Sequence, residues 1–330
     1  MKRKIMAVCM VVIAVCSVLL WKENQAGRPV KAQEAKGLRV ALSQAEPMTP
    51  WKTAQINSFL DAARAQGIEL IYHEPEEETL SWQLEDIRRL FDEGIDYLVL
   101  MPIVRSGYEE ALMEARERGV HVILAEQEVE LEPERRKEDY YLTYVAPDYF
   151  KEGELCADIL SEHFGIQPCN TMVIQGDKES TMSRERYMGF MHGVRVHSNM
   201  YISKRVESNG NRLTAQKATE LTVADQEIDF KAVFAPSDED GLGALQALKL
   251  ADVQPGRDVA LVSIGGIQDV VKAIITEEYL ATVKSSPDYG RVVLDLVRRH
   301  DAGEVLERRV VIANQIYTIE NAEVAFENAY

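Results

Sequence analysis

Short apolar runs recur along the chain from Leu38 onward, and this rhythm constrains the fold more than any other feature of the sequence. Most runs begin about 25 to 32 residues after the previous one, which is the length of one strand-and-helix unit. Strands that are apolar at nearly every position are buried on both faces, so the runs predict mainly parallel sheets with helices on both sides. The runs occupy residues 38–43, 68–73, 96–101, 120–125, 140–145, 171–176, 201–206, 231–236, 259–264, 281–285 and 308–312.

The segments between these runs carry apolar residues at helical spacing, as Ile56, Phe59 and Ala63 do. Eleven strands are more than one such sheet commonly holds, and a chain of 330 residues is longer than one ordinary core requires. The sequence therefore predicts an α/β fold class with two doubly wound, mainly parallel-sheet lobes.

The charge of the chain excludes one class of partner. The formal net charge is −17 at pH 7, and Lys and Arg form no cluster outside the first residues. A nucleic-acid surface requires a basic patch or stripe, so we expect no DNA or RNA partner. An acidic balance of this kind is typical of a soluble domain that stays dispersed.

Residues 1–21 have the layout of a hydrophobic leader. Three cations at residues 2–4 precede an uncharged run at residues 5–21, and such a positive segment stays on the cytoplasmic side of the membrane. A cleaved signal peptide, a retained signal anchor and a lipoprotein signal all stay open. Residues 22–37 are polar without periodicity and predict a linker. We therefore expect export to the cell envelope, in the periplasm or on the outer face of the cytoplasmic membrane, with a membrane contact through the leader.

The four cysteines fall into two pairs. Cys9 and Cys16 lie within the leader, and each follows a valine, whereas lipid attachment requires small residues before the cysteine. Cys156 and Cys169 lie in the part of the chain that would be exported, where cysteines often pair. Their expected positions, on the inner side of a helix and just before a strand, leave pairing open and favour two buried thiols.

Motifs of the common enzyme classes are missing from the sequence, which has no phosphate-binding loop, no HExxH, no CxxC pair and no GxSxG. His163, His192 and His197 lack the spacing of metal ligands, so we expect no metal and no cofactor. Glu126 and Glu128 follow an apolar run and could do acid–base work, but adjacent glutamates are usually a solvated edge. We therefore predict a protein that is not an enzyme.

Binding residues are expected where the predicted strands end, because ligands of open α/β sheets collect at the carboxyl ends of the strands. An aromatic ring, a cation and several polar groups suit a polyhydroxylated ring, which stacks on the aromatic and bonds to the charged groups. Other roles stay open: Asp238 could cap a helix that begins at Glu239, Ser237 could satisfy a turn and Arg186 could be a surface cation. The candidates are Gln44, Trp51, Glu126, Gln127, Arg186, Ser237, Asp238, Gly265 and Ser285.

Seven stretches carry a resemblance to one family: GIDYLVLMPI (94–103), GVHVILAE (119–126), CNTMVIQGD (169–177), RYMGF (186–190), VFAPSDEDGLGALQALK (233–249), LVSIGGIQDVVKAI (261–274) and ATVKSSPDYG (281–290). On these stretches the chain resembles the type I periplasmic (solute-)binding proteins, in the sugar-binding branch of the ribose-binding and galactofuranose-binding kind. The most specific stretch is SDEDGLGALQAL, which is similar to the family's ND-x-MA-x-GA-x-QAL. RYMGF is similar to the family's R-x-x-GF, whose arginine binds ligand hydroxyls.

The resemblance implies two lobes joined by three chain crossings, with the ligand bound between them. Binding of the ligand would favour the closed arrangement of the lobes. Its boundaries place the N-lobe at residues 38–145 and 286–306 and the C-lobe at residues 146–285 and 307–330. It implies a monomer without catalytic activity that binds a small sugar-like molecule. Its partners would be the permease subunits of a sugar-type ABC importer or, as the alternative, a sensor histidine kinase.

The resemblance also bears on single residues. Arg186 and Asp238 match the family motifs, and Trp51 matches the aromatic of the galactofuranose-binding branch, with Lys52 where that branch has arginine. Lys52 therefore joins the candidates. The positions that differ from the family's Asp-Arg, Asn, Asp and hinge Gln are Glu126 with Gln127, Ser237, Gly265 and Ser285. Because these differences remove partners for sugar hydroxyls, the resemblance implies a carbohydrate-like ligand but does not predict an ordinary hexose or pentose.

Overall fold

The computed structural model describes residues 37–132, 140–178, 180–224, 229–327 and 329–330. The chain divides into two units, residues 1–37 and 38–330, and every described residue except Gly37 belongs to the second unit. The predicted leader and linker thus lie outside the described residues. In the described part of the chain, no helix combines the length and the apolar content that a bilayer crossing requires.

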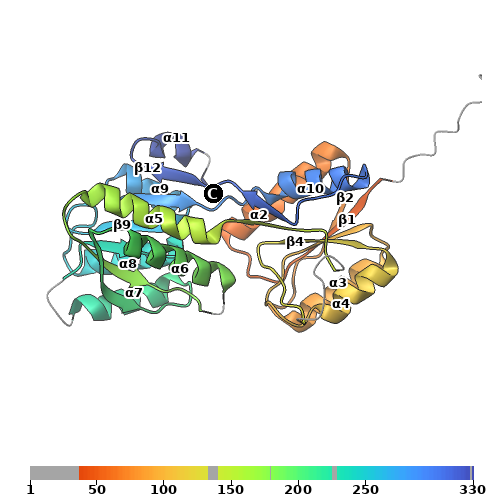
Figure 1. The fold of residues 1–330 in the computed structure, drawn as a ribbon, viewed down its shortest axis with the longest axis horizontal. Helices are drawn as coiled ribbons and strands as arrows, with labels where there is room; N and C mark the ends of the chain where they lie inside the picture. Colours follow the sequence, from red (N-terminus) through yellow and green to blue (C-terminus); the bar gives the residue numbers. More distant parts are fainter. Residues whose placement is uncertain (1–36, 133–139, 179, 225–228, 328) are drawn as a thin grey trace, which may run out of the picture. The chain divides into compact units, whose positions relative to one another are not determined.

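The first sheet consists of six parallel strands with helices on both faces (Figure 1). The strands are β1 (Arg39–Ser43), β2 (Glu69–Tyr72), β3 (Tyr97–Leu100), β4 (His121–Ala125), β5 (Thr143–Pro147) and β11 (Arg309–Ile312), in the order β11-β5-β4-β3-β1-β2. The helices are α2 (Pro50–Gln66), α3 (Leu80–Asp92), α4 (Glu109–Arg118) and α10 (Tyr289–Asp301). Val40 and Leu42 of β1 pack with α2 and α10, whereas Ala41 packs with α3 and α4, as the alternation of a strand requires. We call this sheet with its four helices the first lobe.

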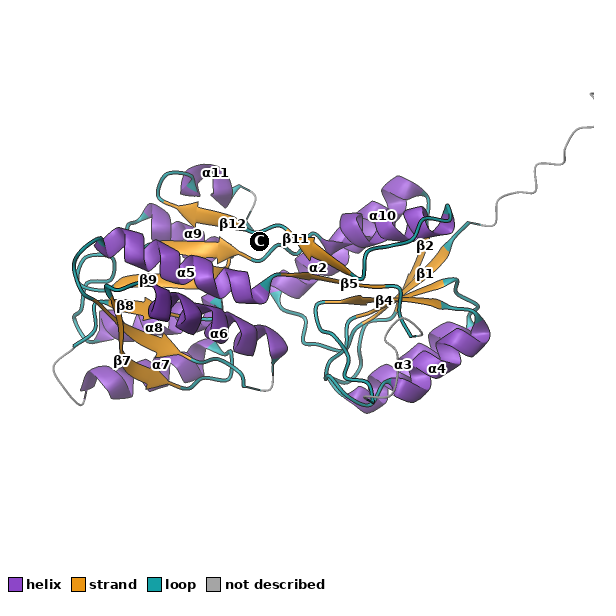
Figure 2. Ribbon diagram, in the orientation of Figure 1, coloured by secondary structure: helices purple, strands orange, loops and turns teal. Residues whose placement is uncertain are grey.

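The second sheet also has six strands, of which one is antiparallel (Figure 2). They are β6 (Cys169–Ile174), β7 (Met200–Val206), β8 (Ala232–Phe234), β9 (Ala260–Gly265), β10 (Ala281–Lys284) and β12 (Gln315–Thr318), in the order β12-β10-β9-β8-β6-β7. The helices are α5 (Tyr149–Phe164), α6 (Thr181–Val196), α7 (Arg212–Ala224), α8 (Asp238–Leu250), α9 (Gln268–Ile275) and α11 (Ala322–Phe326). The helices α5 and α6 cover one face, and α7, α8 and α9 cover the other. We call this sheet with its helices the second lobe.

The predicted fold class is confirmed, because both sheets are mainly parallel and carry helices on both faces. Each of the eleven apolar runs overlaps a strand. The sequence does not predict β12, since QIYT is short, half polar and pairs antiparallel with β10 at a sheet edge. Cys156 and Cys169 are both buried free thiols.

One predicted boundary is wrong. The family boundaries placed residues 307–330 in the C-lobe, but β11 pairs in parallel with β5 in the first sheet, with Arg309 opposite Tyr144 and Val310 opposite Val145. The chain reaches the second sheet only at β12. The reason is that the backbone of β11 forms hydrogen bonds with the edge strand β5. Boundaries carried over from a resemblance take no account of this strand pairing.

Candidate functional site

A cavity of about 460 Å³ is lined by residues of both lobes. Its walls come from the ends of β1, β3, β4, β8, β9 and β10 and from the first turns of α2, α6 and α8, which is where the sequence predicts binding residues. The cavity brings together nine of the ten candidates: Trp51, Lys52, Glu126, Gln127, Arg186, Ser237, Asp238, Gly265 and Ser285.

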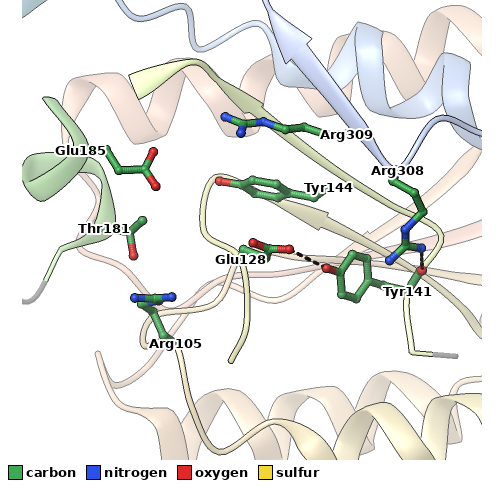
Figure 3. Close-up of a pocket in the computed structure, with 8 residues that line it drawn as sticks. All are labelled: Arg105, Glu128, Tyr141, Tyr144, Thr181, Glu185, Arg308 and Arg309. Atoms are coloured by element: carbon green, nitrogen blue, oxygen red, sulfur yellow. Dashed lines mark hydrogen bonds between the residues drawn. The ribbon is translucent and has the colours of Figure 1, made fainter. Parts of the chain in front are cut away.

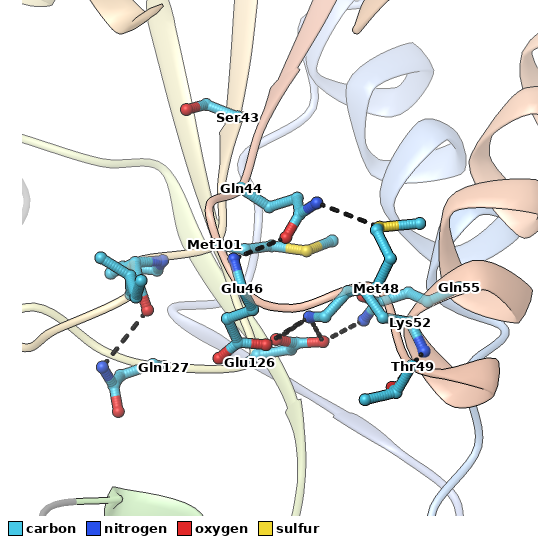
Figure 4. Close-up of polar contacts among 12 residues, drawn as sticks. Ser43, Gln44, Glu46, Met48, Thr49, Lys52, Gln55, Met101, Glu126 and Gln127 are labelled. Carbon is cyan, nitrogen blue, oxygen red and sulfur yellow. Dashed lines mark hydrogen bonds and ion pairs between the residues drawn. The ribbon is translucent and has the colours of Figure 1, made fainter. Parts of the chain in front are cut away.

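The tenth candidate, Gln44, does not line this cavity. Its side chain is fully buried, and its Nε2 donates to the hydroxyl of Tyr72 at 2.9 Å. Its Oε1 accepts from the backbone N–H of Glu46 at 2.9 Å (Figure 4). Gln44 therefore shapes the loop between β1 and α2, and this loop carries Glu46 to the cavity wall.

On the first lobe, a buried lysine is held by carboxylates. Lys52 is 2% exposed, and its Nζ lies 2.9 and 2.8 Å from the two carboxylate oxygens of Glu126 and 2.7 Å from Oε2 of Glu46 (Figure 4). Burial alone would lower the pKa of Lys52, but the charges of Glu126 and Glu46 raise it above its ordinary value. Because an ammonium has three N–H groups, these contacts use its whole donor capacity. Gln55 also donates to Glu126, so the amide and the ammonium together fix that carboxylate.

The backbone of Glu126 is strained. Its φ of 64° lies in the left-handed region, which a side chain other than glycine rarely adopts. Two tyrosines hold this conformation, because the hydroxyls of Tyr144 and Tyr149 donate to the Glu126 carbonyl at 2.7 and 3.1 Å. Strain that is held by its surroundings is frequent at functional sites, and here it turns the carboxylate toward Lys52.

On the second lobe, a buried arginine faces the cavity. Arg186 is 3% exposed, its Nε donates to Oε2 of Glu152 at 2.7 Å, and its Nη1 donates to the Pro236 carbonyl at 3.0 Å. The guanidinium also lies 5.4 Å from the ring of Tyr149. Burial raises the pKa of Glu152, and the charge of Arg186 opposes that rise. A guanidinium has five N–H groups, so donors remain for a ligand in the cavity.

Asp238 has a different role from the one that its position suggests. The cap of α8 is Ser237, whose Oγ accepts from the backbone N–H of Asp240 at 3.1 Å. The carboxylate of Asp238 instead turns into the lobe and accepts four hydrogen bonds, from Ser263 Oγ, Thr282 Oγ1 and the backbone N–H groups of Gly266 and Ile267. The alternative that the sequence left open, in which Asp238 caps a helix beginning at Glu239, is therefore wrong, since α8 begins at Asp238 itself.

This turn of Asp238 explains the glycine at position 265. A Cβ atom on Gly265 would lie 2.5 Å from Asp238 Oδ2 and 2.6 Å from its Cγ, which is closer than atoms can approach. The buried carboxylate cannot move aside without breaking its hydrogen bonds to Gly266 and Ile267. The glycine therefore provides the space that the carboxylate of Asp238 occupies.

We expect Gly265→Ala to lower the free energy of unfolding by about 1–3 kcal/mol, because the added methyl overpacks a site that is already filled. Urea unfolding measures the loss. Gly37→Ala is the matched control, since a Cβ at Gly37 meets no atom within 4 Å, and its effect should stay within about 0.5 kcal/mol. A Gly265→Ala protein as stable as the parent would contradict the placement of Asp238.

Trp51 and Ser285 meet where the chain passes from β10 to α10. The Nε1 of Trp51 donates to the Ser285 carbonyl at 2.8 Å, and the Trp51 ring meets Tyr289 edge to face, with the ring centroids 6.2 Å apart. Trp51 is thus oriented by a bond from α2 to the connection between the two lobes.

Gln127 lies on the loop after β4, and its side chain donates to the Pro102 carbonyl at 3.3 Å.

A second cavity, of about 290 Å³, is lined by Glu128 but not by Glu126, its near neighbour in the sequence (Figure 3). It is lined by Arg105, Glu128, Tyr141, Tyr144, Thr181, Glu185, Arg308 and Arg309. Glu128 accepts from the Tyr141 hydroxyl at 2.7 Å in this cavity, whereas Glu126 bonds to Lys52 in the larger one. The two carboxylates therefore do not face a common substrate position. Among the described residues, no group of three His, Cys, Asp or Glu side chains is placed to hold a metal ion.

Sequence reasoning missed several residues of the larger site: Glu46, Gln55, Tyr149, Glu152 and Tyr330. One of them has a signal in the sequence. Glu152 stands four residues before Cys156 on a helix whose buried face also contains Leu160, and an acidic residue on an apolar face requires a cationic partner. The others lie in loops or at helix positions that look solvent-exposed in the sequence.

Comparisons with known proteins agree with this architecture. Residues 40–304 match the periplasmic binding protein domain. The galactofuranose-binding protein YtfQ of Escherichia coli K12 is 25% identical over 296 residues, which cover 89% of this chain and 92% of that protein. The ribose import binding protein RbsB of Bacillus subtilis 168 is 24% identical over 288 residues, or 86% of this chain and 87% of that protein.

A solved structure gives the same result. The crystal structure of a galactofuranose binding protein superposes with a TM-score of 0.79 at 25% identity, and the match covers 88% of this chain and 98% of that one. The match to the family covers most of the chain and includes most elements of both lobes, ending before β11. The chain therefore belongs to the periplasmic binding protein domain family.

Proposed function

We propose that this chain is an extracytoplasmic binding protein that captures a small carbohydrate-like ligand for an ABC importer. The observation that carries the proposal is the guanidinium of Arg186, which is buried, fixed by Glu152 and directed at a cavity where the strands of both sheets end. The two relatives are a galactofuranose-binding protein and a ribose import binding protein, and their names support a carbohydrate as the class of ligand.

The chemistry of the two walls suits a polar ring. Arg186 offers charge-assisted hydrogen bonds from the second lobe, and these are stronger than bonds between neutral groups. Trp51 offers an aromatic surface for the C–H face of a sugar. On the first lobe, Glu46 is 39% exposed at its side chain and can accept from ligand hydroxyls while it also pairs with Lys52.

Catalysis is not part of the proposal. The hydroxyl of Ser237 caps α8, and the carboxylate of Asp238 is engaged by four donors. Lys52 is held by two carboxylates. A covalent mechanism needs a nucleophile beside a base that can take its proton, and the cavity residues that the structure describes contain no such free pair.

The ligand would act through the motion of the two lobes. The chain passes from the first sheet to α5 after β5, back to α10 after β10, and again to the second sheet between β11 and β12. A ligand that contacts Arg186 on one lobe and Trp51 on the other favours the closed arrangement over the open one. We propose that permease subunits recognise the closed monomer outside the cytoplasmic membrane.

Mass spectrometry of small molecules that co-purify with the full chain tests the ligand class, and we expect a carbohydrate-like compound. Calorimetry with that compound should show that Trp51→Ala weakens binding by roughly tenfold, or about 1.4 kcal/mol, because the stacking surface is lost. Trp51→Phe is the matched control: it keeps a ring and loses only the bond to the Ser285 carbonyl. No carbohydrate in the preparation, together with no binding of any sugar, would count against the function.

One feature of the sequence favours a second function, in signalling. The uncharged run at residues 5–21 is not followed by a clear cleavage site, and a retained anchor would keep the protein beside a membrane partner. The protein would then report ligand to a sensor histidine kinase. Co-purification from detergent-solubilised membranes distinguishes the two functions, since permease subunits are expected for the importer and a kinase for the sensor.

A further inference from the structure

Tyr330 enters the larger cavity from the segment that follows α11. Its position is fixed by the start of α9, because the backbone N–H of Gln268 donates to the Tyr330 carbonyl at 3.0 Å. The side chain of Gln268 also donates to the Ala329 carbonyl at 3.3 Å. Tyr330 is therefore attached to the second lobe by hydrogen bonds from Gln268 to the backbone oxygens of Ala329 and of Tyr330 itself.

The hydroxyl of Tyr330 covers the ends of two neighbouring strands. It donates to the carbonyl of Gly265, the last residue of β9, and lies 3.1 Å from the carbonyl of Ser285, which follows β10. Burial and the charge of Asp238 raise the pKa of Tyr330 well above its usual value, so the hydroxyl keeps its proton and remains a donor.

The Gly265 carbonyl is thereby saturated, and the Ser285 carbonyl is covered. Gly265 also accepts from the backbone N–H of Ser285 at 2.9 Å, and Ser285 also accepts from Trp51 Nε1 at 2.8 Å. A carbonyl oxygen has two lone pairs, so the Gly265 carbonyl has no capacity left for a ligand hydroxyl, while the Ser285 carbonyl is bonded to Trp51 and in contact with the Tyr330 hydroxyl. The carboxylate of Asp238, directly behind Gly265, is occupied by its own four donors.

Around β9 and β10, the wall of the second lobe consequently offers a ligand hydrogen-bond donors rather than acceptors. Its acceptors near β9 and β10 bond within the protein, whereas Arg186, on the same wall, still has N–H groups for a ligand. The space above the two strand ends holds an aromatic ring instead of polar groups. A ligand at this wall gains by presenting oxygen acceptors to Arg186 and gains nothing from extra hydroxyls that reach toward Gly265.

We propose that Tyr330 is a specificity-determining residue, whose ring closes the cavity over β9 and β10 and excludes sugars that extend toward Gly265. The inference rests on the proposed function and deepens it: the ligand is a compact sugar with acceptors on the face that meets Arg186. A larger sugar would have to displace the ring and break the hydrogen bond of its hydroxyl to Gly265 and its contact with Ser285.

Calorimetry on the full chain tests this with four probes, the pentoses D-ribose and L-arabinose and the hexoses D-galactose and D-fructose. Tyr330→Ala should shift the affinity ratio of hexose to pentose at least tenfold in favour of the hexoses, because the ring no longer fills the space. Tyr330→Phe should leave that ratio within about threefold, because the ring stays. Tyr201→Ala, on β7 and 53% exposed, is the matched control and should change nothing.

Each outcome decides the inference. A parent protein that binds a probe while Tyr330→Ala keeps the same ratio overturns the role of Tyr330 and leaves the proposed function intact. If the parent binds none of the probes, Tyr330→Ala must gain binding of at least one hexose, and failure to do so also overturns the role. If no sugar binds any variant and none co-purifies, the proposed function fails and the inference fails with it. A thermal melt of Tyr330→Ala within a few degrees of the parent shows that the variant is folded.

Discussion

Replacement of Arg186 by alanine is expected to lower the free energy of unfolding by about 3–5 kcal/mol and to abolish ligand binding. The first effect follows from Glu152, which is fully buried and would keep a charge without a partner. The second follows from the loss of the donor that faces the cavity. Urea unfolding measures the stability, and calorimetry with the co-purified ligand measures the binding.

The pH dependence of this variant identifies the cause. Burial raises the pKa of Glu152 in the folded protein, and removal of Arg186 removes the charge that opposes this rise. A carboxyl group whose pKa is raised by folding stabilises the protein below its unfolded pKa, and that contribution is lost as pH rises through the folded pKa. The deficit of Arg186→Ala should therefore be smallest in acid and grow toward neutral pH.

Two further variants separate charge from packing. Arg186→Met with Glu152→Gln removes both charges and should recover most of the stability without recovering binding. Arg195→Ala, an exposed position on the same helix, should change stability by no more than about 0.5 kcal/mol. If Arg186→Ala is as stable as the parent at neutral pH, the prediction is contradicted, because Glu152 must then bond to another partner or to solvent.

The general position of the site could be predicted because it follows from the topology. The ends of parallel strands meet at one edge of each sheet, so residues after β4, β8, β9 and β10 had to gather, and nine candidates do line one cavity. The apolar runs predicted the strands for the same reason: burial on both faces leaves a clear pattern. The edge strand β12 leaves no such pattern, since half of its residues are polar.

The roles of individual residues could not be predicted from strand ends. Lys52 is a charged residue near the start of a helix, yet it is buried, because Glu126 arrives from the loop after β4 and Glu46 from the loop before α2. Asp238 precedes a helix in the sequence, but four donors from β9, β10 and the loop after β9 turn it inward. In each case deciding partners, Glu126 for Lys52 and the donors of β9 and β10 for Asp238, are distant along the chain, so no local pattern records them.

Lys52→Met is expected to lower the free energy of unfolding by about 3–5 kcal/mol, an effect as large as that of Arg186→Ala. The side chain of Lys52 is 2% exposed and that of Glu126 is 13% exposed, so methionine fills the volume but leaves a buried carboxylate without its cation. Glu46 suffers less, since it is 39% exposed and water can replace the ammonium. Urea unfolding at neutral pH measures the loss, and Lys151→Met, at a 49% exposed lysine paired with Glu154, should stay within about 0.5 kcal/mol.

The double variant Lys52→Met with Glu126→Gln distinguishes the charge of the lysine from its shape. With both charges removed, the buried site contains methionine and two amides, Gln55 and the new glutamine, which can bond to each other in place of the Gln55–Glu126 bond. Replacement of a buried ion pair by neutral groups of similar volume is often nearly neutral, so the double variant should lie within about 1–2 kcal/mol of the parent. If it is no more stable than Lys52→Met alone, the lysine stabilises the loop between β1 and α2 by packing, and the buried pair does not decide the stability of this wall of the cavity.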